Sequence, residues 1–253
     1  MSDSSSRTPS DYGDSFADVY DDWYAGITDA EATADRIAAL VAEAGGGPVL
    51  ELGVGSGRLA LPISERGVEV VGVDSSPAML DLLGSKPGAD RISVLQADMA
   101  TVDLVAPGPF AVVLVAFNTF FNLDAPGRQL RCMEGIARVL APGGSLVVEA
   151  FVPTERAGGV ERDLSTARVD LERVVLTATE HDPDAQTVVG QHIDITATGV
   201  RLRPWRIRYL TPGQLDDVAG RAGLHLVERH AGWSGERFDE DSSVHVSRYG
   251  ARH

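Results

Sequence analysis

Three glycines alternate with other residues, at Gly53, Gly55 and Gly57, between an apolar run and a helical pattern. Glycines allow a tight turn and let a ligand approach the backbone, and the first turn of a helix offers free amide donors. The loop could be an ordinary strand-to-helix turn or a cofactor site. Nicotinamide and flavin sites have the spacing G-x-G-x-x-G, whereas the spacing here is G-x-G-x-G. The spacing therefore disfavours a nicotinamide-dependent dehydrogenase.

Two carboxylates follow later apolar runs. Asp74 comes 21 positions after Gly53, at the end of a Val-rich run, where a carboxylate can accept hydrogen bonds from both hydroxyls of a ribose. Asp98 follows the next run, where a carboxylate can accept from the exocyclic amine of adenine. Either acid could be only a helix cap. Because loop and acids stand at the ends of consecutive strands, together they predict a site for an adenosine-containing cofactor.

The strands that must position these residues are recognisable between residues 47 and 151. Five short runs are rich in Val and Leu and apolar on both faces, as buried parallel strands are. They cover residues 48–53, 68–73, 92–96, 110–116 and 145–151. Helical patterns separate them, one beginning at Ser76 with proline in its first turn and another ending at Pro142. Alternating strands and helices predict a doubly wound sheet, whose carboxyl ends bring the loop and both acids together.

The pattern changes after residue 151. Three strands without helices between them are predicted over residues 169–179, 188–198 and 200–209, followed by a helix over 212–222 and strands over 224–230 and 244–249. The predicted fold is α/β, with a doubly wound, mostly parallel seven-stranded sheet, helices on both faces and an antiparallel β insert after the fifth strand. The predicted division is a leader and lid over 1–28, a cofactor-binding core over 29–151, a substrate-side insert over 152–210 and a closing helix and strand pair over 211–253.

The composition restricts the partners. The chain has 37 Asp and Glu against 22 Lys and Arg, a formal net charge of −15. Nucleic acids and anionic membranes are bound by clustered cations, so we expect neither kind of partner. No apolar run approaches the ~18 residues of a membrane span, and the Ser-rich start lacks the apolar core of a signal peptide. We therefore expect a disordered leader and a cytoplasmic protein.

The single cysteine, Cys132, cannot form an internal disulfide and is expected to be a buried thiol. No metal site is expected. The oligomeric state is left open between a monomer and a homodimer.

Four stretches resemble motifs of the class I (Rossmann-like) S-adenosylmethionine-dependent methyltransferases. They are Glu51–Gly57, Gly72–Leu80, Gln96–Met99 and Leu140–Gly144. More loosely, Val19–Tyr24 is similar to the segment that closes over the cofactor in small-molecule and sugar N-methyltransferases of antibiotic pathways. The resemblance implies methyl transfer from S-adenosylmethionine to N or O of a small-molecule metabolite by in-line displacement, as in natural product biosynthesis, with S-adenosylhomocysteine as product.

The resemblance also implies roles for individual residues. The glycine loop would face the methionine part of the cofactor, Asp74 would hold the ribose, and Asp98 and Met99 would contact adenine, with Met79 packed on its face. Backbone groups of Ala116 and Phe117 would lie beside the sulfonium. The other residues assigned to the cofactor are Tyr20, Tyr24, Glu51 and Ser75, together with Arg58, which could pair with the cofactor carboxylate or be a solvated helix arginine.

The residues that act on the acceptor are harder to identify. Tyr20 and Tyr24 share one face of a predicted helix, where they are either a lid whose hydroxyls touch the methionine carboxylate or the acceptor, or aromatic residues that pack a terminal helix. His192, on the polar side of a predicted strand, is the candidate base, with surface exposure as the alternative. Asn118 and Phe121 follow the fourth strand, where the acceptor should bind.

Four arginines lie within one segment of the predicted insert, at positions 201, 203, 206 and 208. They could bind an anionic acceptor, for which Arg206 is the candidate, or pair across strands with Asp170, Glu172 or Asp194.

Other functional classes remain as alternatives. A relative that binds the cofactor but catalyses a different reaction, such as a cyclisation, would have the same motifs. A non-catalytic binding module is disfavoured because the glycine loop and both acids are intact.

Overall fold

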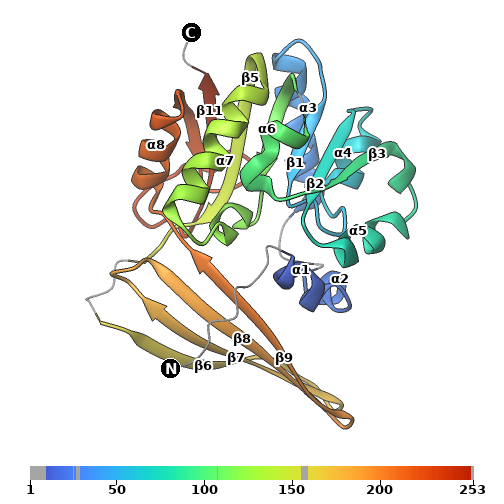
Figure 1. Ribbon diagram of the computed structural model, residues 1–253, viewed down its shortest axis with the longest axis vertical. Helices are drawn as coiled ribbons and strands as arrows, with labels where there is room; N and C mark the ends of the chain where they lie inside the picture. The colour runs from blue at the N-terminus through green and yellow to red at the C-terminus, as the bar shows by residue number, and fades with distance from the viewer. Residues whose placement is uncertain (1–9, 25, 27–28, 107, 155–158, 252–253) are drawn as a thin grey trace.

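A seven-stranded sheet and a smaller four-stranded sheet make up the protein in the computed structural model (Figure 1), which describes residues 10–24, 26, 29–106, 108–154 and 159–251. The strand order of the larger sheet is β10-β11-β5-β4-β1-β2-β3. Its strands are β1 (Val49–Leu52), β2 (Val70–Asp74), β3 (Ile92–Gln96), β4 (Phe110–Val115), β5 (Leu140–Phe151), β10 (Leu224–His230) and β11 (Val244–Ala251). β11 is antiparallel to both of its neighbours, β10 and β5, and the other six strands run in one direction. The predicted fold class is confirmed.

Helices cover both faces of this sheet (Figure 1). Alternate residues of β4 enter two hydrophobic clusters, since successive side chains of a strand point to opposite faces. Val113 packs in the cluster that contains Ile136 of α7, while Val112 packs with Ile37 of α3. The helices are α3 (Ala30–Glu43), α4 (Ala60–Glu65), α5 (Pro77–Gly84), α6 (Val102–Val105), α7 (Pro126–Val139) and α8 (Pro212–Arg221), with short 3-10 turns η1 (Ala89–Arg91), η2 (Met99–Thr101) and η3 (Thr119–Asn122).

The insert is an antiparallel sheet of four strands rather than the predicted three. Its strands are β6 (Glu161–Val169), β7 (Arg173–Asp182), β8 (Thr187–Thr196) and β9 (Gly199–Arg208). β6 was missed because every one of its residues is exposed, so its sequence lacks the alternation of a half-buried strand. The predicted strand 169–179 is wrong at its start, because the side chain of Asp170 accepts hydrogen bonds from the amides of Glu172 and Arg173 and forms a turn there.

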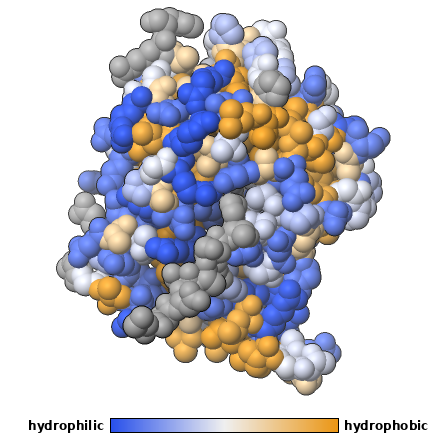
Figure 2. Space-filling model, viewed as in Figure 1, coloured by the Kyte–Doolittle hydropathy of each residue, from blue (hydrophilic) through white to orange (hydrophobic). Residues whose placement is uncertain are grey.

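One face of the insert carries exposed apolar side chains. Leu202 of β9 lies opposite Ile193 of β8, and Val200 lies opposite Ile195, so these four share a face. Leu202 and Val200 are exposed. Figure 2 shows a hydrophobic patch over the insert, toward the bottom of the view. The other face of the insert packs against the N-terminal helices and the core.

Those N-terminal helices are α1 (Asp11–Phe16) and α2 (Tyr20–Tyr24), and we call residues 11–24 the strap. The strap lies between the larger sheet and the insert (Figure 1) and is tied to both. The polar ties to the core are Asp14 to Ser76 Oγ (2.6 Å), Asp21 to Ser56 Oγ (2.6 Å) and Asp21 to Lys86 Nζ (2.6 Å); those to the insert are Asp18 to Arg201 and Arg203 (2.7 and 2.6 Å) and Asp22 to Arg168 (2.7 Å).

The predicted leader and lid extends over residues 1–28, of which 1–9, 25, 27 and 28 lie outside the described residues. None of the helices that the structure describes is both long and apolar enough to cross a membrane.

Candidate functional site

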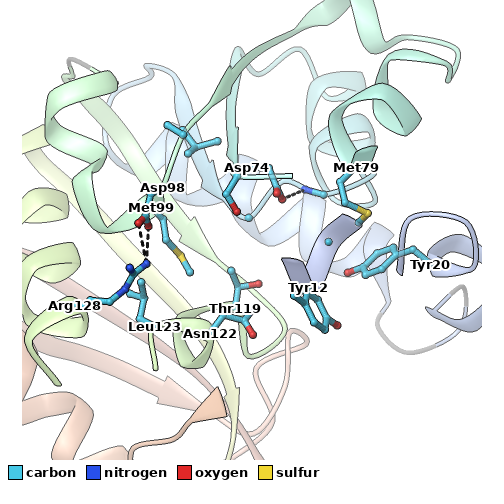
Figure 3. Close-up of a pocket in the computed structure, with 16 residues that line it drawn as sticks. Tyr12, Tyr20, Asp74, Met79, Asp98, Met99, Thr119, Asn122, Leu123 and Arg128 are labelled. Atoms are coloured by element: carbon cyan, nitrogen blue, oxygen red, sulfur yellow. Dashed lines mark hydrogen bonds and ion pairs between the residues drawn. The ribbon is translucent and has the colours of Figure 1, made fainter. Parts of the chain in front are cut away.

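A cavity opens at the carboxyl ends of β1 to β4 (Figure 3). The topology dictates this position, because parallel strands in an open sheet end at one edge and the order reverses between β1 and β4. Eight residues predicted to bind the cofactor line the cavity: Tyr20, Gly53, Gly55, Asp74, Ser75, Met79, Asp98 and Met99.

The glycine loop forms one wall. Gly53 and Gly55 have φ of 73° and 53°, a left-handed backbone that L side chains rarely adopt. A Cβ at Gly53 would also collide with Thr119 of η3. Glycine is therefore required here both by conformation and by the close approach of a neighbouring turn.

The carboxylate of Asp74 holds this loop. Its Oδ2 accepts from the amide of Gly55 and its Oδ1 from the amide of Ser76, both at 2.9 Å. Burial raises the pKa of Asp74, and the two amides oppose that shift. Each carboxylate oxygen has a second lone pair, so the group can still accept from a ligand in the cavity.

The carboxylate of Asp98 has a different environment. It caps η2 by accepting from the amide of Ala100 at 2.9 Å, and Nη2 of Arg128 donates to both of its oxygens at 3.1 and 2.8 Å (Figure 3). Arg128 also lines the cavity and was not predicted. Nothing in the local sequence links it to Asp98, because the two residues lie 30 positions apart and meet only when α7 packs beside η2.

The strap supplies an aromatic wall. Tyr12 and Tyr20 line the cavity, and Tyr24 lies behind them, with its ring centroid 4.8 Å from that of Tyr20 and 5.7 Å from that of Phe117. Burial raises the pKa of Tyr12, and Tyr24 is its hydrogen-bond partner. Tyr12 was also missed, although a signal exists: aromatic residues recur every four positions at 12, 16, 20 and 24.

Ionisable groups gather where the glycine loop meets the strap. Glu51 is only 4% exposed, and burial raises its pKa to about 8, with the nearby Arg58 acting in the opposite direction. Its Oε2 has no hydrogen-bond partner among the described residues. The guanidinium of Arg58 lies 5.4 Å from the ring centroid of Phe117. Burial likewise raises the pKa of Tyr20 to about 12.

The predicted acceptor residues lie outside the lining of this cavity. Phe121 is fully buried against Phe151, with ring centroids 5.3 Å apart. Asn118 Oδ1 accepts a hydrogen bond from the amide of Phe151 at 2.7 Å. Arg206 is exposed and lies opposite Val189 in the insert, on the face that carries Leu202.

His192, the candidate base, lies against the strap. Its Nδ1 is 2.9 Å from Thr177 Oγ1, and its ring centroid lies 5.5 Å from that of Phe16 and 5.6 Å from that of Trp23. Burial, followed by the nearby Arg203, lowers the pKa of its imidazole. The structure does not bring His192 to the cavity wall.

Arg201 and Arg203 of the arginine cluster are paired with carboxylates. Arg203 is 1% exposed and pairs with Asp194 at 3.4 Å, one of the predicted cross-strand partners. Arg203 and Arg201 also pair with Asp18 of the strap, which was not predicted. Arg201 and Arg203 therefore bind the strap, whereas Arg208 donates to Oε1 of Gln129 in α7.

A second cleft lies where the insert joins the core. Phe151, His181, Val188 and Tyr209 are among its lining residues, and His181 Nε2 lies 2.8 Å from the hydroxyl of Tyr209. Among the residues that the structure describes, no group of three or more His, Cys, Asp or Glu side chains is arranged to hold a metal ion.

Comparison with known proteins agrees with this geometry. Residues 49–144 match a family model described as a methyltransferase domain. The solved structure of the CcbJ methyltransferase from Streptomyces caelestis is 41% identical, with a TM-score of 0.89, and the match covers 98% of this chain and 100% of that chain. The cypemycin N-terminal methyltransferase of a Streptomyces species is 29% identical over 195 residues, which are 76% of this chain and 78% of that protein.

A more distant structure shares the fold. It is the structure of CalS10, an amino pentose methyltransferase of Micromonospora echinaspora, with bound S-adenosylmethionine. CalS10 is 22% identical to this chain, with a TM-score of 0.67, and the match covers 91% of this chain and 96% of that chain. The family model and the near-complete match to CcbJ confirm the family, cofactor and enzyme class that the sequence motifs predicted. The chain belongs to the S-adenosylmethionine-dependent methyltransferases.

Proposed function

We propose that the protein transfers a methyl group from S-adenosylmethionine to an amine nitrogen of a small molecule. The observation that carries the proposal is the arrangement of the cavity. Asp74 and Asp98 stand at the ends of neighbouring strands, the glycine loop forms one wall, and tyrosines of the strap form another.

The described residues fit the cofactor along this cavity. Asp74 would accept from the ribose hydroxyls, and Asp98 and the amide of Met99 would contact adenine, with Met79 packed on the ring. The methionine end would then face the glycine loop and Glu51. A buried carboxylate oxygen without a donor is costly, and an ammonium group would satisfy the orphaned Oε2 of Glu51.

The remaining cofactor residues would surround the reacting end. When bound, the cofactor supplies a methyl group on a positively charged sulfur. The protein has to hold the acceptor nitrogen in line with that methyl and keep water out. Tyr20, Tyr24 and Phe117 pack together here, and their rings can stabilise the positive charge that an amine acquires on methylation. We also assign Arg58, Ser75 and the backbone of Ala116 to this end.

An amine acceptor suits the available side chains. An amine attacks as the neutral base and loses its proton after transfer, whereas an alcohol needs a base during attack. Among the described residues that line the cavity there is no His, Lys or Cys. The relative named as a cypemycin N-terminal methyltransferase supports nitrogen as the acceptor atom.

We place the acceptor on the insert side of the cavity. The second cleft lies there, and Phe151 lines it. The ring of Phe151 contacts Phe121 of η3. Two other residues of that turn, Thr119 and Asn122, line the cofactor cavity. In this arrangement the insert is the substrate-side element and residues 29–151 are the cofactor-binding core. That division, the absence of nucleic-acid and membrane partners and the cytoplasmic location stay predictions.

Calorimetric titration with S-adenosylmethionine, S-adenosylhomocysteine and NADH tests the cofactor. We expect micromolar dissociation constants for the first two and no heat from NADH. Binding of NADH alone would contradict the whole proposal.

A panel of amines, including amino sugars, and of matched alcohols tests the acceptor, with release of S-adenosylhomocysteine as the signal. Methylation of amines alone is the expected result. Methylation of alcohols alone would contradict the nitrogen assignment. Cofactor binding without turnover on any member would favour a reaction other than methylation.

A further inference from the structure

Two consecutive residues at the end of β4 have a left-handed backbone without being glycine. Phe117 has φ of 49° and Asn118 has φ of 63°. Asn adopts this conformation with some ease, but for a bulky residue such as Phe it is strained. Strained pairs of this kind persist only where surrounding contacts impose them, and they concentrate at functional sites.

One residue of the neighbouring strand holds both strained amides. Oε2 of Glu149, on β5, accepts from the amide of Phe117 at 2.9 Å, and the main-chain oxygen of Glu149 accepts from the amide of Asn118 at 3.0 Å. Asn118 Oδ1 then accepts from the amide of Phe151, two residues further along β5, at 2.7 Å. We call these three hydrogen bonds the β4 clamp.

The carboxylate in the clamp is buried at a cost. Glu149 is 6% exposed, and burial raises its pKa, while the Phe117 amide, the Trp233 indole and Arg58 oppose the shift. A carboxylate is a stronger acceptor for an amide than a neutral side chain is, because the bond is charge-assisted. The costly buried acid is therefore the side chain best able to impose the strained conformation.

The clamp determines where the ring of Phe117 lies. The guanidinium of Arg58 lies 5.4 Å from the Phe117 centroid, and Tyr24 of the strap meets the ring edge to face at 5.7 Å. Phe117 thus joins the turn that follows the glycine loop to the strap, at the end of the cavity where methyl transfer is proposed. If the left-handed pair relaxed, both contacts would be lost together.

We propose that Glu149 is a positioning residue for methyl transfer, which holds the strained Phe117–Asn118 turn so that the Phe117 ring and backbone border the transferred methyl group. This inference rests on the proposed function for the location of the methyl group. Glu149 itself acts through Phe117 and need not touch either substrate.

The test compares Glu149→Gln, which retains a neutral acceptor of the same shape, with Glu149→Ala, which retains none. The Phe117 amide is followed by NMR with [¹⁵N]phenylalanine, with and without S-adenosylmethionine. We expect a downfield, slowly exchanging amide in the wild type, an intermediate one in Glu149→Gln, and an upfield, fast-exchanging one in Glu149→Ala. With an acceptor from the amine panel, kcat should fall about tenfold to a hundredfold in Glu149→Ala and much less in Glu149→Gln, while KM for the cofactor changes little.

A second pair of variants separates positioning from general stability. Asn118→Gly and Asn118→Ala lose the same side-chain oxygen, but only glycine adopts the left-handed backbone freely. In the Glu149→Ala background we therefore expect Asn118→Gly to restore part of kcat relative to Asn118→Ala. If Glu149→Ala does not fold, the test uses Glu149→Gln and the two Asn118 variants in the wild-type background. We then expect a lower kcat and an upfield Phe117 amide in Glu149→Gln relative to the wild type, and the same changes in Asn118→Ala relative to Asn118→Gly.

Two results would overturn the inference. One is a Phe117 amide that is unchanged in Glu149→Ala; the other is an unchanged kcat in that variant. Failure of the proposed function looks different, because the wild-type protein itself would then bind no S-adenosylmethionine or release no S-adenosylhomocysteine. The amide measurement without ligand still tests the clamp in that case.

Discussion

Replacing Asp74 by alanine removes the carboxylate that the proposal gives to the ribose. The same carboxylate also accepts from the amides of Gly55 and Ser76, so two effects must be separated. Gly55 lines the cavity, where water can replace the lost acceptor, whereas Ser76 is buried outside its lining. Burial raises the pKa of Asp74, so its removal also relieves a desolvation cost, and we expect little change in the stability of the ligand-free protein.

The effect on the cofactor should be larger. Hydrogen bonds from ribose hydroxyls to a carboxylate are charge-assisted, but their net value is reduced because the empty cavity is hydrated. We expect a loss of about 1–3 kcal/mol in binding free energy, which corresponds to an about 5- to 150-fold weaker Kd.

Calorimetric titration with S-adenosylhomocysteine measures this change without turnover. Asp81→Ala is the matched control, because Asp81 is an exposed acid on α5 near the same site. A melting curve without ligand separates binding from folding. If Asp74→Ala bound the ligand within twofold of the wild type, the ribose assignment would be wrong.

Three further predictions concern other parts of the molecule. Replacing Arg128 by alanine should weaken cofactor binding about two- to fivefold, as measured by titration. The effect is small because the ion pair of Arg128 with Asp98 is about one-third exposed (38% and 28%) and so contributes only ~0.5–1 kcal/mol. Tighter binding by the variant would mean that Arg128 competes with adenine for Asp98. His245 is fully buried, and burial lowers the pKa of its imidazole to about 4, whereas in the unfolded chain the imidazole takes up its proton near pH 6.5. The free energy of unfolding should therefore fall by up to ~3 kcal/mol as the pH drops from 6.5 toward 4. Urea unfolding at pH 7 and pH 5 tests this, and the His245→Asn variant should show a smaller drop. Asp18→Asn should leave the buried Arg203 poorly paired. We therefore expect amide hydrogen exchange in the strap to be roughly tenfold faster, as measured by mass spectrometry. Unchanged exchange would show that other contacts hold the strap.

The core of the fold could be predicted because burial leaves a strong pattern. β1 and β4 are buried along their whole length; β4 is a continuous apolar run, and β1 departs from one only at the buried Glu51. Asp74 and Asp98 could be placed together because the ends of parallel strands meet at one edge. β6 could not be predicted, since a fully exposed strand leaves no period in its sequence.

The site residues that were missed depend on contacts between distant parts of the chain. Arg128 reaches Asp98 across 30 positions, and Glu149 reaches Phe117 across 32. The sequence around Arg128 and around Glu149 contains no local pattern that predicts which residue each contacts. His192 shows the converse: its position on a polar strand face was predicted, but the strap that packs on it comes from the other end of the chain.

The strap has a kinetic consequence. Tyr12 and Tyr20 line the cavity from the strap, so a ligand that leaves past them has to displace a segment tied at once to the core and to the insert. Its ties are ionic on both sides, through Asp21 and Lys86 toward the core and through Asp18 and Arg203 toward the insert. Counter-ions weaken such ties. We therefore expect the residence time of S-adenosylhomocysteine, more than its affinity, to shorten as ionic strength rises, so that the salt concentration of the assay sets how fast successive turnovers can begin.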